Sequence, residues 1–225
     1  MLLSDCGRTS ADNEDMPALL LPLFPLSTVL LPSTPLPLHV FEERYKELMG
    51  LLIPDHGEFG VVLAKDGGLV NIGCTATVEQ VVRRYPDGRL DILAMGRRRF
   101  QILSLDEEES YLRAEVDFFN DDDAAPVPPN LRQRAISEYN RLRSLEDDDT
   151  IGEPRLGEPQ LSFQLAQSLD DMGHRQALLV MRSETERLTY LVQSLPGYIT
   201  RRQQISLARR LAPRNGHARQ YKEES

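Results

Sequence analysis

The segment Leu19–Tyr45, LLLPLFPLSTVLLPSTPLPLHVFEERY, decides how this chain folds. It is strongly apolar, yet it contains five prolines, at positions 22, 25, 32, 35 and 37. Proline removes a backbone donor and interrupts a helix, so this density excludes a membrane-spanning helix and a regular central strand. The prolines therefore divide the segment into short extended pieces.

A helical period begins where the prolines end. Phe41, Arg44, Tyr45, Leu48 and Leu52 are spaced as one face of a helix over about 41–52. Arg44 then lies on the apolar face, where an unpaired guanidinium is costly. We expect Arg44 to be buried in an ion pair with a carboxylate or bonded to a carbonyl, and contact with a ligand is the alternative.

Period-two alternation beyond this segment predicts strands. In residues 111–119, Leu112, Ala114, Val116 and Phe118 share one face, as in a half-buried strand. The turn signal at 86–88 (PDG) joins a strand that ends near residue 84 to one that begins near residue 90. Run lengths and turns predict six to eight short strands with one inserted helix.

The composition changes after residue 119. Residues 120–130 are acidic and proline-rich, as in a linker, and residues 131–212 have the periodicity of five helices. A capping box at 183–186 (SETE) opens the fourth helix, and Pro196-Gly197 is predicted to end it. The predicted fold class is α+β, with a β domain over 19–119 followed by a helical bundle. We expect residues 1–18 to be a disordered leader and 213–225 a frayed tail.

Charge and cysteine content limit the function classes. The net charge of −9 over 225 residues argues against a general nucleic-acid binder, which needs clustered cations. Cys6 and Cys74 lie far apart and do not suggest a disulfide scaffold. The acidic N-terminus does not resemble a signal peptide. We therefore expect a cytoplasmic protein without a membrane segment.

No pattern in the sequence supports catalysis. There is no phosphate-binding loop, and the four histidines, at 39, 56, 174 and 217, lack metal-ligand spacing. His39 is expected to be a packed, hydrogen-bonded residue. The acidic runs, among them Asp121–Asp123, lack the spaced ligands and glycine of a calcium loop, so we expect solvated turns. The sequence predicts no enzyme activity, no cofactor and no metal.

Several segments resemble, in order, the N-terminal substrate-binding domain of Lon-type proteases. They are Pro22–Leu26 (PLFPL), Val29-Leu30, Pro37–Glu42 (PLHVFE), Arg44-Tyr45, Phe59–Leu63 (FGVVL), Ile72–Val78 (IGCTATV), Tyr85–Arg89 (YPDGR), Gly96–Ile102 (GRRRFQI) and Tyr111–Val116 (YLRAEV). A looser likeness covers Ser162–Gln167 and Arg175–Leu179. Within the run of arginines, Arg99 is the one that matches the family pattern. The resemblance implies a PUA-like β pseudo-barrel with one inserted helix, followed by a helical bundle.

The same resemblance implies a non-catalytic module that binds unfolded or tagged polypeptides, either alone or with a protease or a chaperone. The ATPase and Ser-Lys protease motifs of Lon-type enzymes are not found, so proteolysis is not implied. Apolar residues between the prolines are expected near an edge, where a charged rim borders them. The candidate apolar residues are Phe24, Leu26, Leu30 and Leu36, and the candidate rim is Glu42, Glu43 and Lys46. The alternative for the apolar residues is plain core.

Two other function classes are weaker. RNA binding rests on the PUA-like fold and on a basic last helix, with Arg201-Arg202 and Arg209-Arg210. A solvated helix whose charge suits its dipole is the preferred interpretation of these arginines, and the acidic total argues against RNA. We therefore expect no nucleic-acid partner. A small hydrolase has no nucleophile–base pair to support it.

Overall fold

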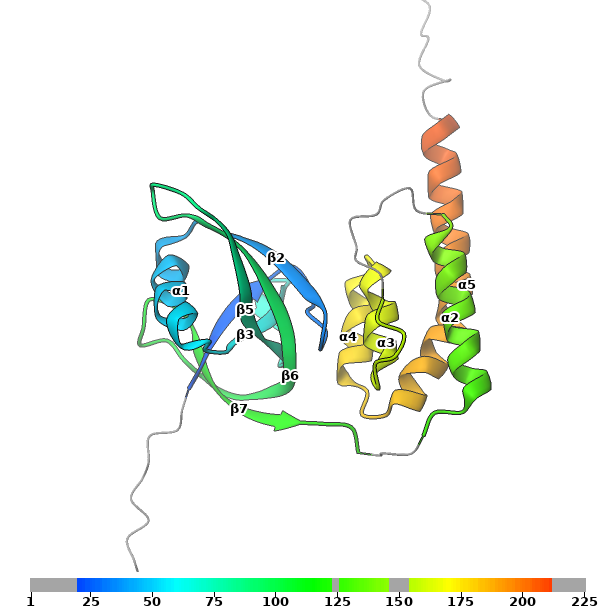
Figure 1. Cartoon of the computed structure of the whole chain (residues 1–225), viewed down its shortest axis with the longest axis horizontal. Helices are drawn as coiled ribbons and strands as arrows, with labels where there is room; N and C mark the ends of the chain where they lie inside the picture. Colours follow the sequence, from blue (N-terminus) through cyan, green and yellow to red (C-terminus); the bar gives the residue numbers. More distant parts are fainter. Residues whose placement is uncertain (1–19, 123–125, 146–153, 212–225) are drawn as a thin grey trace, which may run out of the picture.

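The structure is a computed structural model that describes residues 20–122, 126–145 and 154–211. The predicted leader and tail lie outside the described residues, as do 123–125 of the predicted linker. Figure 1 shows a barrel of strands at one end of the molecule and a group of helices at the other. The mixture of helix and mainly antiparallel sheet agrees with the predicted α+β class.

Seven strands lie within the described residues and close into a barrel. They are β1 (Leu21–Leu26), β2 (Pro35–Val40), β3 (Phe59–Lys65), β4 (Gly68–Leu69), β5 (Ile72–Arg84), β6 (Leu90–Asp106) and β7 (Arg113–Phe119). Their order is β1-β7-β6-β5-β3, and the parallel pairing of β1 with β3 completes the ring. β2 pairs with the first part of β6, and β4 with the end of β3.

The predicted hairpin between β5 and β6 is confirmed. The N–H of Tyr85 donates to the carbonyl of Arg89 at 2.9 Å. Gly88 has a φ of 83°, which a glycine adopts without steric cost. Three register shifts between β5 and β6 bend these long strands around the barrel.

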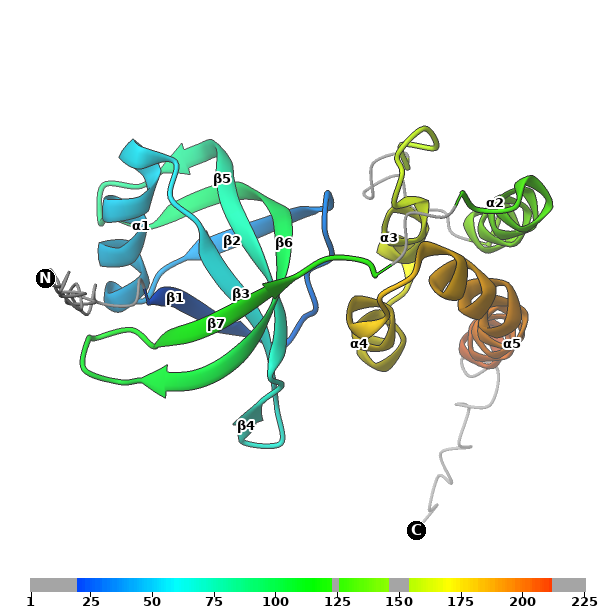
Figure 2. The same ribbon diagram turned by 90° about the horizontal axis from the view of Figure 1, so that it is seen from below.

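Helix α1 (Glu43–Asp55) lies at the end of the barrel away from the C-terminal helices (Figure 2). It buries Tyr45 and Leu48 of the predicted face, together with Met49, and leaves Phe41 and Arg44 exposed. The predicted burial of Arg44 is wrong. Its side chain is exposed and pairs with Glu42 at 2.7 Å. Phe41 precedes the helix, so the apolar face is set by Tyr45 and the residues after it, and Arg44 falls outside that face.

The second part of the chain is helical. It contains α2 (Pro129–Arg143), α3 (Leu161–Leu165), the 3₁₀ helix η1 (Ala166–Ser168), α4 (Met172–Val180) and α5 (Glu184–Leu211). The predicted capping residue Ser183 accepts from the N–H of Glu186 at 3.4 Å. The predicted stop at Pro196-Gly197 is wrong, because α5 continues to Leu211. Proline removes one helical hydrogen bond and kinks a helix without always ending it, and Figure 1 shows α5 bending along its length.

The barrel and the helices share one hydrophobic core. A single cluster of buried side chains runs from Phe24 and Phe59 in the barrel to Phe163 and Leu188 in the helices. Side chains of the helical part also bond to barrel backbone, as where Gln164 Nε2 donates to the carbonyl of Ser33 at 2.8 Å. The helices are therefore packed on the end of the barrel. No helix in the described ranges combines the length and apolar composition that a membrane crossing demands.

Candidate functional site

The structure places the predicted apolar surface residues mostly inside the barrel. Phe24 and Leu30 are 6% and 3% exposed, and Phe24 stacks on Tyr45 with ring centroids 4.0 Å apart. Leu26 and Leu36 are half-buried and pack against the same core. Surface roles for Phe24 and Leu30 are therefore contradicted. On β2, Pro35 and Pro37 reach solvent instead, because alternation along that strand turns Leu36 inward.

The predicted charged rim lies beside the β5–β6 hairpin. Glu42 and Glu43 are exposed, and Lys46 is half-buried. Lys46 Nζ donates to Glu43 at 2.5 Å and to the backbone carbonyl of Asp87 at 3.2 Å. Lys46 thus ties the start of α1 to the tip of the hairpin.

An exposed, partly apolar surface covers the outside of β2, β6 and β5, which lie next to one another (Figure 1). On β2, the outward residues pair with outward residues of β6, and Ile92 and Ala94 between them point into the core. Val82 of β5 sits at a register shift and is 60% exposed. We call this surface the outer wall, and it consists of Pro35, Pro37, His39, Val82, Asp91, Leu93 and Met95.

The free edge of β2 is poorly suited to accept another strand. β2 pairs with β6 alone among the described strands. Pro35 and Pro37 have no N–H, and a proline in a sheet keeps its nitrogen turned away from the partner strand. The free edge therefore lacks donors at two positions. Strand addition at this edge is therefore disfavoured.

Three aromatic rings stand at one end of the outer wall, and we call them the aromatic corner. His39 lies 6.0 Å from Phe41 and 5.9 Å from Tyr85, measured between ring centroids. The Asp91 carboxylate accepts from His39 Nδ1 at 2.6 Å and from the Tyr85 hydroxyl at 2.7 Å. The bond from His39, followed by that from Tyr85, holds the pKa of Asp91 below its usual range. Asp91 thus fixes two rings, and Phe41 projects beside them, 60% exposed.

A buried ionic network joins the barrel to the helices. Arg187 of α5 donates to both oxygens of Asp121, at 2.6 and 2.7 Å, and Arg99 of β6 donates to one of them at 2.6 Å. Arg187 also donates to Glu184 at 2.9 Å, which accepts from the Ser162 hydroxyl at 2.6 Å. The prediction that Asp121 is a solvated linker residue is wrong, because two buried cations distant in sequence surround it.

The network predicts how stability depends on pH. Burial alone would raise the pKa of Asp121, but the hydrogen bonds and charges of Arg187 and Arg99 outweigh it and hold the pKa below its usual range. The carboxylate therefore stabilises the fold fully above its unfolded pKa of about 3.9, and this contribution is lost as pH falls through the lower folded value.

We expect Asp121→Asn to flatten the acid side of the stability profile. Urea unfolding of the wild type should show a falling free energy between about pH 4 and pH 2, and the variant should show a smaller fall. Asp117→Asn, on the exposed side of β7, is the control and should follow the wild type. Parallel profiles for wild type and Asp121→Asn would contradict the assigned role.

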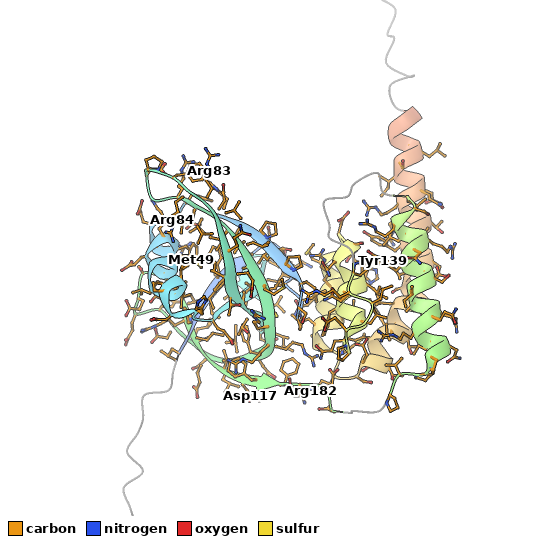
Figure 3. The ribbon with its side chains drawn as sticks, viewed as in Figure 1. Met49, Arg83, Arg84, Asp117, Tyr139 and Arg182 are labelled. Carbon is orange, nitrogen blue, oxygen red and sulfur yellow. The ribbon has the colours of Figure 1, made fainter. Side chains whose placement is uncertain are left out.

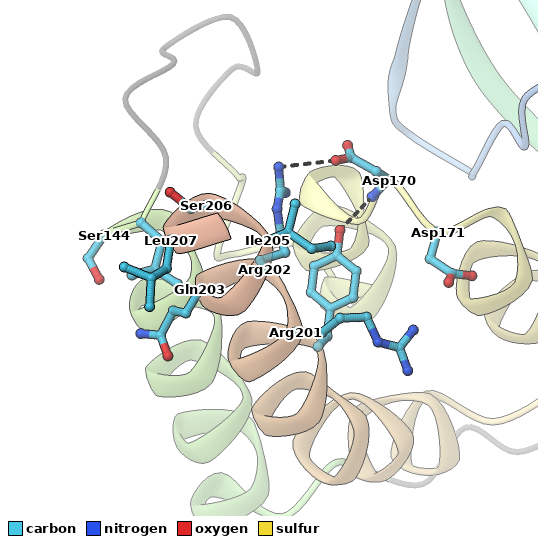
Figure 4. Close-up of a pocket in the computed structure, with 11 residues that line it drawn as sticks. Ser144, Asp170, Asp171, Arg201, Arg202, Gln203, Ile205, Ser206 and Leu207 are labelled. Atoms are coloured by element: carbon cyan, nitrogen blue, oxygen red, sulfur yellow. Dashed lines mark hydrogen bonds and ion pairs between the residues drawn. The ribbon is translucent and has the colours of Figure 1, made fainter. Parts of the chain in front are cut away.

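A concavity of about 770 Å³ lies against the second half of α5 (Figure 4). The end of α2 and the residues before α4 complete its lining. Arg202 bonds to Asp170 at 3.1 Å, and the N–H of Asp170 donates to the Tyr198 hydroxyl at 3.0 Å. Some of the polar residues that line the concavity are therefore already bonded to one another. Across the described ranges, no group of three or more His, Cys, Asp or Glu is placed to hold a metal ion.

Comparison with known proteins agrees with this architecture. The family described as the ATP-dependent protease La (LON) substrate-binding domain matches residues 20–205. The Lon protease of Anaeromyxobacter dehalogenans is 30% identical over 171 residues, which are 72% of this chain and 19% of that protein. The Lon protease of Cytophaga hutchinsonii is 24% identical over 157 residues, 66% of this chain and 18% of that protein. The chain thus spans about a fifth of the length of these relatives.

Solved structures show the same fold. The crystal structure of a Lon N-terminal domain protein from Xanthomonas campestris superposes with a TM-score of 0.63 at 28% identity, covering 77% of this chain and 97% of that one. The N-terminal domain of a Mycobacterium avium complex Lon protease has a TM-score of 0.56 at 16% identity, covering 79% and 98%. Because the family match spans both the barrel and the C-terminal helices, the chain belongs to the LON substrate-binding domain family.

Proposed function

We propose that this protein is a non-catalytic recognition module that binds unfolded or tagged polypeptides through the outer wall and the aromatic corner. The observation that carries the proposal is the exposure of Phe41 and Val82, both 60%, on one side of a substrate-binding-type domain. Exposed apolar side chains with a polar surround are the usual anatomy of a protein-binding surface. The surface replaces the one predicted from Phe24 and Leu30.

The relatives suggest the setting in which such a module works. They are Lon proteases, and this chain matches about a fifth of their length. We propose that the module presents protein substrates to a protease, with a chaperone as the alternative partner. Glu42, Glu43 and Lys46 border the aromatic corner and form the charged rim of the proposed surface.

The PUA-like description of the barrel is part of this proposal, and it is the main support for the RNA-binding alternative. Ion pairing weakens that alternative. On β6, Arg97 bonds to Glu79, and Arg98 bonds to Glu58 at 3.0 Å. These arginines are therefore partly neutralised, and the net charge of −9 opposes phosphate binding.

Binding of an unfolded model polypeptide tests the proposal. Phe41→Asp should weaken binding to the full chain by tenfold or more, because burial of a Phe side chain is worth about 1.5–3 kcal/mol. Isothermal titration calorimetry should also give a negative heat-capacity change. The matched control is Leu51→Asp, on a residue of α1 that is 59% exposed and not part of the outer wall.

The two variants distinguish binding at the proposed surface from nonspecific hydrophobic binding. Leu51→Asp should bind as the wild type does, and both variants should keep the wild-type melting temperature, because both side chains are exposed. Equal weakening by both variants, or none by Phe41→Asp, would place the binding surface elsewhere.

A further inference from the structure

Two arginines at the tip of the β5–β6 hairpin have no ion-pair partner among the residues that the structure describes. Arg83 and Arg84 end β5, and both are exposed. Figure 3 shows them together at the tip of the hairpin, on the opposite side of the molecule from Arg182. Within the described ranges, neither one makes a hydrogen bond to an acidic side chain. Arg83 instead packs over Tyr85, with its Cζ 4.7 Å from the ring centroid.

Other arginines of the barrel, including Arg89 in the same hairpin, are matched with acids. Arg89 pairs with Asp87 at 2.7 Å, Arg98 with Glu58 at 3.0 Å, and Arg113 with Asp106 at 2.8 Å. The nearest acid on the outer wall, Asp91, already accepts from His39 and Tyr85. In a chain of net charge −9, the end of β5 thus presents two exposed cations on its two faces: Arg83 lies opposite Asp91, on the outer wall, and Arg84 lies opposite Leu90, on the other face.

We propose that the outer wall selects extended polypeptide segments in which an apolar or aromatic residue is flanked by acidic residues. The inference rests on the function proposed above. The apolar residue packs on Phe41 and Val82, and the flanking carboxylates bond to Arg83 on the outer wall and to Arg84 across the end of β5. The forked donors of both arginines match carboxylate geometry. Because β2 lacks donors at its free edge, side chains rather than backbone bonds set this specificity.

A polypeptide fits the hairpin tip better than a nucleic acid. Aromatic rings beside arginines can also bind single strands, but they do so by stacking bases on a free ring face. Arg83 and Arg89 both pack over Tyr85, at 4.7 and 4.9 Å. His39 is held between Phe41 and Tyr85. Phe41 is 60% exposed and the His39 side chain 45%, so Phe41 is the most open ring of the aromatic corner.

The test uses the full chain and three fluorescein-labelled peptides that share a Phe-Leu core. One peptide has Glu flanks, one has Lys flanks and one has Ser flanks, and fluorescence anisotropy gives the Kd of each. We expect the Glu-flanked peptide to bind roughly fivefold more tightly than the Ser-flanked one at low salt, as two exposed ion pairs provide. The difference should shrink as salt screens the pairs.

A double variant and a matched control locate the selectivity. Arg83→Gln with Arg84→Gln should make the Glu- and Ser-flanked peptides bind equally and should leave binding of the Ser-flanked peptide unchanged. Arg134→Gln with Arg141→Gln on α2 makes the same change in net charge and should keep the preference. Loss of the preference in both double variants would overturn the inference, since net charge alone would then explain it.

The remaining outcomes separate this inference from the proposed function. If all three peptides bind equally and Phe41→Asp weakens each one, the surface is correct and the acidic preference is wrong. If no peptide binds, or if Phe41→Asp changes nothing, both proposals fail. A labelled oligouridine that binds more tightly than the Glu-flanked peptide and loses affinity with Arg83→Gln and Arg84→Gln would overturn the inference in favour of RNA.

Discussion

Arg187→Met should lower the free energy of unfolding by about 3–5 kcal/mol. The Arg187 side chain is fully buried, and it donates to both oxygens of Asp121 and to Glu184. Methionine fills similar volume, so the main loss is the cation, which leaves Glu184 without its charged partner in a dry site. Arg99 alone then compensates Asp121.

Urea and thermal unfolding measure this effect. For a chain of this size, the expected loss corresponds to a fall of roughly 10 °C in melting temperature. Arg141→Met is the control, because Arg141 lies on the exposed side of α2 and pairs with Glu138 at 2.7 Å in solvent. It should cost less than about 1 kcal/mol. An Arg187→Met protein as stable as the control would mean that the ionic network between the barrel and the helices does not contribute to the free energy of unfolding.

Gly96→Ala should destabilise the barrel by about 2–3 kcal/mol. A Cβ at position 96 would lie 2.1 Å from the carbonyl oxygen of Leu31, which is backbone and cannot rotate away. Gly96 is also bonded on both sides, since its N–H donates to Thr34 and its carbonyl accepts from Ser33. The β1–β2 loop therefore passes directly over β6, and an added methyl group would push it off.

Gly50→Ala is the opposite case and serves as the control. Gly50 lies within α1, and a Cβ added there would meet no described neighbour within 4 Å, so alanine should stabilise by up to about 1 kcal/mol. Chemical unfolding of both variants should therefore move in opposite directions. Destabilisation of equal size in both would indicate a general intolerance of glycine replacement and not a close approach at residue 96.

The sequence predicted well what depends on neighbours along the chain. The hairpin at 85–89 follows from a turn signal and the cap at Ser183 from a local motif, and both are present. Predictions about which side faces the core were less successful. The helix face at Arg44 was misplaced because Phe41 was counted as helical, although it precedes α1.

Features that depend on distant partners could not be predicted in this way. In the sequence, Asp121 is the first of three consecutive aspartates, and nothing local distinguishes it from the others. Only the fold brings Arg99 and Arg187 to its carboxylate. The outer wall did leave a signal, since Pro35, Pro37 and His39 alternate with inward residues along β2. That period-two pattern identifies the outward face of β2. It does not show that β6 and β5 lie beside β2, because strand pairing depends on residues distant in sequence.

The two neighbours of β1 set the order in which the barrel can be completed. β1 pairs with β3 on one side and, through Leu21 and Ala114, with β7 on the other. During synthesis, β1 must therefore wait for β7, almost a hundred residues later, before its second edge is covered. Pairings so distant in sequence slow folding. We expect nascent chains that stop before β7 to carry open edges on β1 and β6, the kind of edge that promotes aggregation.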